Sequence, residues 1–449
     1  MLFYAIGDLS SHGAWMMSIW TRAVEMAGAT PPERNRYVDF LRAVSILMVV
    51  TGHWLVASTW YQDGTLIPGD LLELRPRTQW LTWLFQVMPI FFIVGGYANA
   101  VSLESAKRRG VGYAGWLATR LHRLVTPLLA LLLGWGLLAT LLYFFGVSGD
   151  ITRLASRGAL IPIWFLAIYI AIVLLAPLTY KAWQRWGFVS LLGFAAAGAL
   201  VDAAFFMANM EWLGWTNYFW VWLSVHHLGY AWRDGRLGSP ARLLIYSALG
   251  FGVLWLLVFK GPYPFAMVGS PDEGLSNTLP PKMTLFALGV FQFGLLLAIE
   301  PPMRKFLSNV RVWAATVLIN SMIMTLYLWH ITVMIVVVAL SYMMDGFGLG
   351  LEPGTLEWWI TRPVWIGLLY AILLPLTMAL SPLERRARPA DKPIPSAVRQ
   401  VGGALVICLG VAYLALFGFG SAPLPFLDII AFFTVIAGSW LSGLLHGFK

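Results

Sequence analysis

Two ionisable residues stand eleven positions apart in the stretch RAVSILMVVTGH, which runs from Arg42 to His53 and holds no other charge. Eleven residues make about three turns of an α-helix, so both side chains lie on one face, roughly 16 Å apart along the axis. A neutral imidazole in such a place can act as a general base on a hydroxyl group. It can equally be a structural histidine that a single hydrogen bond satisfies.

The composition of the chain places this stretch in a membrane. Of its 449 residues, 59% are hydrophobic and 11% are charged, whereas a soluble globular protein carries roughly 25% charged residues. The 23 Trp and 16 Tyr suit aromatic belts at two lipid–water boundaries. An ionisable group at membrane depth is costly unless it faces a partner or a polar cavity. The alternative to a functional role for Arg42 is that its side chain simply extends to the lipid headgroups. Asp39, three residues earlier, is either the partner of Arg42 or a carboxylate that stabilises the first turn of the helix.

Three further classes of site find no support in the sequence. The single Cys408 excludes an intrachain disulfide framework. The net charge of +9 is expected to lie in loops beside anionic lipid, so no nucleic-acid partner is predicted. His226 and His227 are adjacent and would point about 100° apart on a helix, so we predict no chelating pair and no metal site.

Apolar runs of about 20 residues, long enough to span a bilayer, predict an all-α bundle of about twelve transmembrane helices. They lie near 40–60, 80–103, 121–146, 160–180, 187–207, 213–232, 241–259, 283–300, 313–340, 360–381, 399–419 and 424–446. Most of the Lys and Arg residues fall in alternate connecting segments. The positive-inside rule then puts both termini in the cytoplasm. The expected location is a bacterial-type inner (plasma) membrane.

The stretch VDFLRAVSILMVVTGH resembles the first helix of the acyltransferase-3 family of integral membrane O-acyltransferases, in which Asp-hydrophobic-Leu-Arg is followed ten residues later by histidine. Other motifs resemble the family in the same order: FFIVGGYANA, with Gly95 where serine is usual, then RLHR for its R-x-x-R, then IWFL and YLWH. The resemblance covers about 34–385. It implies a ten-helix core over 37–385, with a cytoplasmic or interfacial leader over 1–36. A cytoplasmic loop over 386–398 and two additional helices within 399–449 complete this arrangement.

By this resemblance, His53 is the catalytic histidine and Arg42 its essential companion. Arg120 and Arg123 share one helix face, and the resemblance assigns them to the donor, because guanidinium groups suit the phosphates of acyl-CoA. Acyl-CoA is then a substrate, and no permanently bound cofactor is expected. Tyr97 or Tyr327 is a candidate donor to the oxyanion. His330 is a candidate by its motif, with a structural role as the alternative. Two further candidates are Asp39, because it lies beside Arg42, and Asp202, because of its depth in the membrane alone.

The predicted activity is transfer of an acetyl or other short acyl group from cytoplasmic acyl-CoA to a hydroxyl of an envelope glycan, glycolipid or related acceptor. Its partners are acyl-CoA, a lipid or carbohydrate acceptor and membrane lipids, and the sequence predicts no oligomeric state. Two alternatives remain open. One is a proton-coupled secondary transporter with His53 and Asp202 as relay, and the other is a flippase for lipid-linked sugars.

Overall fold

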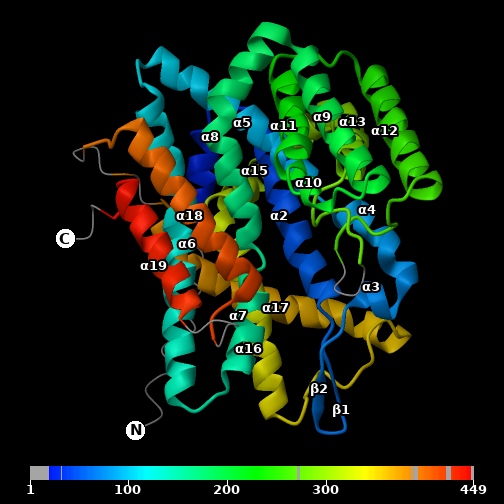
Figure 1. Ribbon diagram of the computed structural model, residues 1–449, viewed down its shortest axis with the longest axis vertical. Helices are drawn as coiled ribbons and strands as arrows, with labels where there is room; N and C mark the ends of the chain where they lie inside the picture. The colour runs from blue at the N-terminus through cyan, green and yellow to red at the C-terminus, as the bar shows by residue number, and fades with distance from the viewer. Residues whose placement is uncertain are drawn as a thin grey trace.

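The structure is a computed structural model that describes residues 20–31, 33–269, 274–385, 388, 393–420 and 426–445. It is a bundle of long helices, most of them running between the same two ends of the molecule (Figure 1). Residues 20–28 of the predicted leader are helical, and residues 1–19 lie outside the described part of the chain.

The regular elements described are one short hairpin and a series of helices. The hairpin strands are β1 (Trp60–Gln62) and β2 (Thr65–Ile67). The helices of the first half are α2 (Arg36–Val56), α3 (Leu71–Leu74), η1 (Pro76–Leu81), α4 (Thr82–Phe85), α5 (Met88–Arg108), α6 (Tyr113–Phe144), α7 (Gly149–Leu160), α8 (Ile163–Trp186) and α9 (Phe188–Met207). The remaining helices are α10 (Glu211–Gly214), α11 (Asn217–Arg233), α12 (Pro240–Lys260), α13 (Met283–Ala298), α14 (Glu300–Phe306), α15 (Val310–Asn320), α16 (Ile323–Met343), α17 (Leu356–Arg385), α18 (Ala397–Phe417) and α19 (Leu427–Leu441).

The predicted all-α membrane fold is confirmed. Within the described residues, 9 helices are long and apolar enough to cross a membrane, and 10 if the bent pair α13 and α14 forms one span. Two further predicted spans correspond to α11 with 17 residues and α19 with 15, which is less than the roughly 20 residues of a typical span. The span predicted near 313–340 is divided into α15 and α16. At the break Asn320 and Ser321 donate side-chain hydrogen bonds to backbone carbonyls, which competes with continued helix formation.

The two ends of the bundle differ in chemistry. The end at which α2 and α6 begin carries Arg42, Arg120 and Arg123 and is called the basic end here; it is uppermost in Figure 1. The opposite end carries the β1–β2 hairpin and is called the hairpin end. Asp63 and Gly64 form the two-residue hairpin loop, and both have positive φ (50° and 81°), which the twist of such a hairpin favours.

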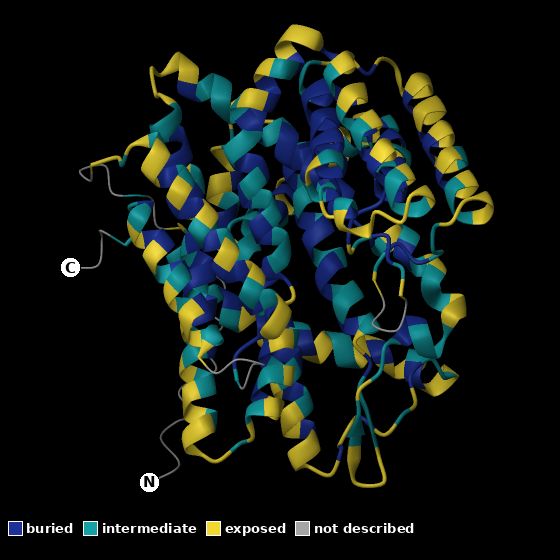
Figure 2. Cartoon of the chain, viewed as in Figure 1, coloured by how far each residue is buried: buried dark blue, intermediate teal, exposed yellow. Residues whose placement is uncertain are grey.

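Buried residues occupy the middle of the bundle, whereas peripheral helices such as α12 present exposed faces, as lipid-facing helices do (Figure 2). Lipid supplies no hydrophobic force between helices, so close packing of small residues must hold them together. Gly96 on α5 and Gly229 on α11 provide one such contact: a Cβ atom added at either would meet backbone atoms of the other helix. This crossing fixes the position of α5 in the site described below.

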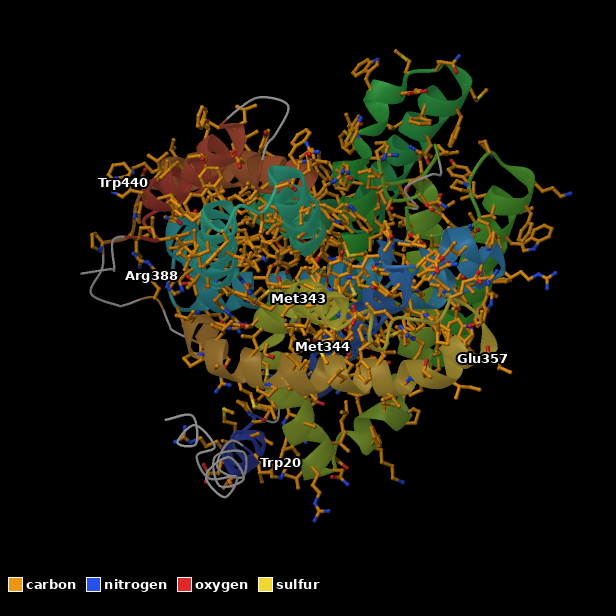
Figure 3. The ribbon with its side chains drawn as sticks, turned by 90° about the horizontal axis from the view of Figure 1, so that it is seen from below. Trp20, Met343, Met344, Glu357, Arg388 and Trp440 are labelled. Carbon is orange, nitrogen blue, oxygen red and sulfur yellow. The ribbon has the colours of Figure 1, made fainter. Side chains whose placement is uncertain are left out.

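The last two helices pack against each other and against the rest of the bundle. Gly403 on α18 and Gly438 on α19 bring the two backbones together. Buried apolar residues of α18, such as Ile407 and Val411, join the cluster formed by α6 and α8. Seen from the hairpin end, Trp440 on α19 marks one edge of the molecule. In the same view α17 runs from Glu357 toward Arg388, passing Met343 and Met344 at the end of α16 (Figure 3).

Candidate functional site

The two histidines of the sequence motifs meet in the structure. His53 on α2 and His330 on α16 are hydrogen-bonded through Nδ1 and Nε2 at 2.8 Å, and their rings are stacked with 5.1 Å between centroids. His330 is fully buried, whereas His53 is only partly so. The structure thus brings together two candidates that lie 277 positions apart in the chain.

The hydrogen bonds around this pair determine where the protons lie. Nδ1 of His330 is 2.6 Å from the carbonyl oxygen of Tyr327, which can only accept, so this nitrogen carries the proton. In a neutral ring, Nε2 of His330 must then accept, and Nδ1 of His53 donates to it. The remaining nitrogen of His53, Nε2, is left with an unshared lone pair. That tautomer is the one a general base requires.

The position of His330 is fixed by contacts at both ends of its segment of α16. The carboxylate of Glu384, from α17, accepts hydrogen bonds from the backbone N–H groups of Met324 and Thr325 at 3.1 and 3.0 Å. Glu384 therefore caps the N-terminus of α16, where orphan donors and the helix dipole favour a negative charge. Trp54, next to His53, donates its indole N–H to the carbonyl of His330 at 3.0 Å. These bonds tie α2, α16 and α17 together around the histidine pair.

A hollow of about 460 Å³ opens at the basic end, between α2, α5, α6, α8, α16 and α17. Its mouth holds the exposed residues Glu33, Arg34 and Arg123. The predicted residues Asp39, Arg42, Tyr97, Arg120, Arg123 and Tyr327 all line it. The structure thus brings six of the nine candidate residues together in this one hollow.

The arginines of the hollow differ in how they are paired. Asp39 accepts from Arg34 at 2.6 Å and lies 3.5 Å from Arg42, so the predicted partner of Arg42 is shared. Arg120 donates to the backbone carbonyl of Ala98 at 3.2 Å. Among the described residues, neither Arg120 nor Arg123 forms an ion pair with a carboxylate. Their guanidinium groups therefore keep donors for an anion that enters the hollow.

The hollow approaches the histidine pair but does not include it among its lining residues. Ile46 and Tyr327 are the lining residues nearest in sequence to His53 and His330. Ile46 is about two helical turns, roughly 10 Å, from His53 along α2, and Tyr327 is about one turn from His330 along α16. The hollow thus covers the first part of the distance between the arginines and His53, and it ends short of the base.

The two tyrosines proposed as oxyanion donors lie in different settings. Tyr97 stands near the mouth of the hollow, where its hydroxyl is 3.4 Å from the side-chain nitrogen of Asn35. Tyr327 is buried and donates its hydroxyl to the carbonyl of Pro162 at 2.8 Å. Their assignment stays a prediction, and Tyr327 would have to break this bond to donate elsewhere.

Asp202 lies apart from the other candidates and does not line the hollow. Its carboxylate accepts hydrogen bonds from Asn217 at 2.8 Å, from Tyr263 at 3.0 Å and from the backbone of Met283 at 2.8 Å. Beside it, burial lowers the pKa of Lys282, whose ammonium lies 3.5 Å from the centre of the Phe205 ring. These contacts join α9, α11 and α13 and are those of a structural junction.

The sequence reasoning missed Tyr169 on α8, which lines the hollow beside Gly95. A Cβ atom added at Gly95 would lie 2.9 Å from Cε2 of Tyr169 and 3.0 Å from its hydroxyl. The absence of a side chain at Gly95 therefore admits the phenol to the space where the resembled family carries a serine hydroxyl. Gly95 in FFIVGGYANA was the available signal, but only the structure shows which side chain fills the space.

A second missed pair lies in the wall of the hollow, where Asn99 is 3.1 Å from Nε2 of His226. His227, its neighbour, points elsewhere and bonds to the carbonyl of Leu223.

Within the described residues, no group of three or more His, Cys, Asp or Glu side chains is arranged to hold a metal ion.

The chain was compared with models of protein families, with curated proteins and with solved structures. A family model described as an acyltransferase domain matches residues 35–382, which include the histidine pair, Arg42, Arg120 and Arg123 but not α18 and α19. A search of curated proteins found no match, and a search of solved structures found none. Because the match covers most of the chain, the protein belongs to the acyltransferase-3 family and is a membrane acyltransferase.

Proposed function

We propose that the protein is an O-acyltransferase that moves an acetyl or other short acyl group from cytoplasmic acyl-CoA to a hydroxyl of an envelope glycan, glycolipid or related acceptor. The observation that carries the proposal is the His53–His330 pair beyond the inner end of a hollow in which, among the described residues, Arg120 and Arg123 form no ion pair with a carboxylate. A base with a free nitrogen and a cationic entrance are the two features that hydroxyl acylation by a phosphate-bearing donor requires.

The donor is assigned from the charges of the hollow. Arg120 and Arg123 keep free N–H donors, and planar guanidinium groups bind phosphate oxygens two at a time. The pyrophosphate of CoA then lies at these arginines, and its pantetheine arm extends along α2 toward His53. The positive-inside rule supports a cytoplasmic position for the basic end, where CoA is available.

The reaction needs no covalent enzyme intermediate. His53 Nε2 takes the proton of the acceptor hydroxyl as its oxygen attacks the thioester carbonyl. A hydroxyl of Tyr97 or Tyr327 is the predicted donor to the oxyanion, and Tyr169 is a third candidate because it also lines the hollow. Collapse of the tetrahedral intermediate breaks the C–S bond. The proton on His53 then passes to the thiolate, which leaves as CoA.

The test is transfer of label from acetyl-CoA in membranes that contain the protein and its natural acceptors. Wild-type membranes should yield a labelled lipid or glycan. His53→Ala should lower the rate by about 10² to 10⁴, the usual contribution of a general base. Equal labelling by His53→Ala, with the protein inserted at wild-type level, would contradict the assignment.

A second test separates the donor site from the base. The double variant Arg120→Ala, Arg123→Ala should bind CoA about tenfold or more weakly, because two charge-assisted contacts are lost. Arg311→Ala removes an exposed arginine of α15 that does not line the hollow and serves as the matched control. Unchanged CoA affinity in the double variant would show that the phosphates bind elsewhere.

A further inference from the structure

A second hollow, of about 430 Å³, lies at the basic end beside the first. It is formed by the loop between α11 and α12, by the ends of α12 and α13, and by α14. Its lining residues are Asn35, Tyr97, Trp232, Arg233, Gly235, Leu237, Gly238, Pro240, Leu243, Leu297, Glu300, Pro301 and Arg304. Apart from Tyr97, the residues that line this hollow have no part in the reaction described above.

The two hollows share a wall. Asn35 and Tyr97 line both of them. The side-chain nitrogen of Asn35 is 3.4 Å from the Tyr97 hydroxyl and 3.4 Å from a carboxylate oxygen of Glu300. The ring of Tyr97 lies 4.8 Å from that of Trp232, which donates its indole N–H to Glu300 at 3.1 Å. The second hollow therefore adjoins the first at the side chains of Asn35 and Tyr97.

The second hollow combines an apolar surface with cationic groups. Leu237, Leu243 and Leu297 supply the apolar part, and its volume is in the range of pockets that hold small ligands. Arg304 donates through Nε and Nη2 to Glu300, which leaves its other terminal nitrogen for a ligand. Its side chain is 56% exposed, so a phosphate can reach it. Such a mixture suits a nucleoside that carries a phosphate.

We infer that the second hollow holds the adenosine 3′-phosphate end of acyl-CoA, with Arg304 beside the 3′-phosphate; this inference rests on the proposed function. If the pyrophosphate lies at Arg120 and Arg123 and the pantetheine arm extends toward His53, the nucleoside must leave the arginines in the other direction. The first hollow opens at the basic end, and its wall there is formed by Asn35 and Tyr97. The second hollow adjoins this wall and is large enough for the base and ribose.

The experiment compares three probes on the purified full-length protein in lipid nanodiscs: CoA, 3′-dephospho-CoA and 4′-phosphopantetheine. Wild-type protein should bind CoA more tightly than 3′-dephospho-CoA. Arg304→Ala should weaken CoA binding by roughly three- to fivefold, as an exposed charge pair allows, and leave 3′-dephospho-CoA binding unchanged. Arg304→Lys should recover part of the loss, and Arg311→Ala should show none.

A second variant tests the cavity itself. Leu237→Trp fills the second hollow and should weaken CoA and 3′-dephospho-CoA alike, while 4′-phosphopantetheine, which has no nucleoside, binds as before. Melting temperatures of both variants check that the fold is intact. Equal wild-type affinity for CoA and 3′-dephospho-CoA, or unchanged CoA binding in both variants, would overturn the inference and leave the proposed donor in place. Failure of wild-type protein to bind any of the three probes would instead overturn the proposed function.

Discussion

A single imidazole on α2 would be free to rotate and to exchange its proton between two nitrogens. In this protein the carbonyl of Tyr327 fixes the proton of His330, and His330 in turn fixes that of His53. The Arg42–His53 spacing was visible in the sequence because depth makes an isolated charge costly. The role of His330 was not, since no local pattern relates two residues that are 277 positions apart.

The orienting role of His330 can be separated from a structural one. His330→Phe keeps a ring in place but removes the acceptor, so His53 loses its fixed orientation and kcat should fall roughly 100-fold. His330→Gln restores an acceptor near the position of Nε2 and should recover part of that loss. The measurement is kcat with labelled acetyl-CoA, alongside the melting temperature of each variant. Equal loss of activity in both variants, in step with lost stability, would indicate a structural residue only.

At the scale of elements, the spans were predictable but their contacts were not. Apolar runs indicated where helices lie, and the adjacent Asp63 and Gly64 are a hairpin signal that hydropathy does not carry. The break between α15 and α16 depends on Asn320 and Ser321 bonding back to their own helix, which a hydropathy pattern does not reveal. The pairing of α5 with α11 depends on Gly96 and Gly229 facing each other, which the sequence alone could not show.

This pairing predicts a stability effect at Gly229. A Cβ atom there would lie 2.6 Å from the backbone nitrogen of Tyr97, and backbone cannot move aside as a side chain can. Gly229→Ala should therefore destabilise the protein by about 1–3 kcal/mol and weaken CoA binding by displacing α5. Gly252→Ala on α12, where a Cβ atom meets nothing within 4 Å, is the control. Melting curves that show the same stability for both variants would argue against a tight α5–α11 contact.

At the scale of the whole molecule, the proposed chemistry requires the basic end to face the compartment that contains CoA. The sequence predicted this orientation from the distribution of Lys and Arg alone. In the structure, the arginines of the hollow gather at one end and the β1–β2 hairpin lies at the other, so the orientation can be tested with one residue from each end.

Cysteine labelling in intact cells provides that test. Cys408 is the single native cysteine, so Cys408→Ser gives an unreactive background. A membrane-impermeant maleimide should label Gln62→Cys, exposed on the hairpin, in intact cells. It should label Gly112→Cys, exposed between α5 and α6 at the basic end, only after permeabilisation. The reverse pattern would place the arginines proposed to bind CoA outside the cell and contradict the proposed donor.

The hydrogen-bond chain of the site ends at a group that cannot pass a proton on, and this limits the proton transfers that the site can perform. A proton wire must take up a proton at one terminus and release it at the other. Here one terminus is the backbone carbonyl of Tyr327, which has no proton to release and cannot hold one. Protons can therefore be taken up and released only at Nε2 of His53. The pair is built to store a proton for the duration of one chemical step and return it on the same side. That behaviour suits a base in a transferase and disfavours a relay through the membrane.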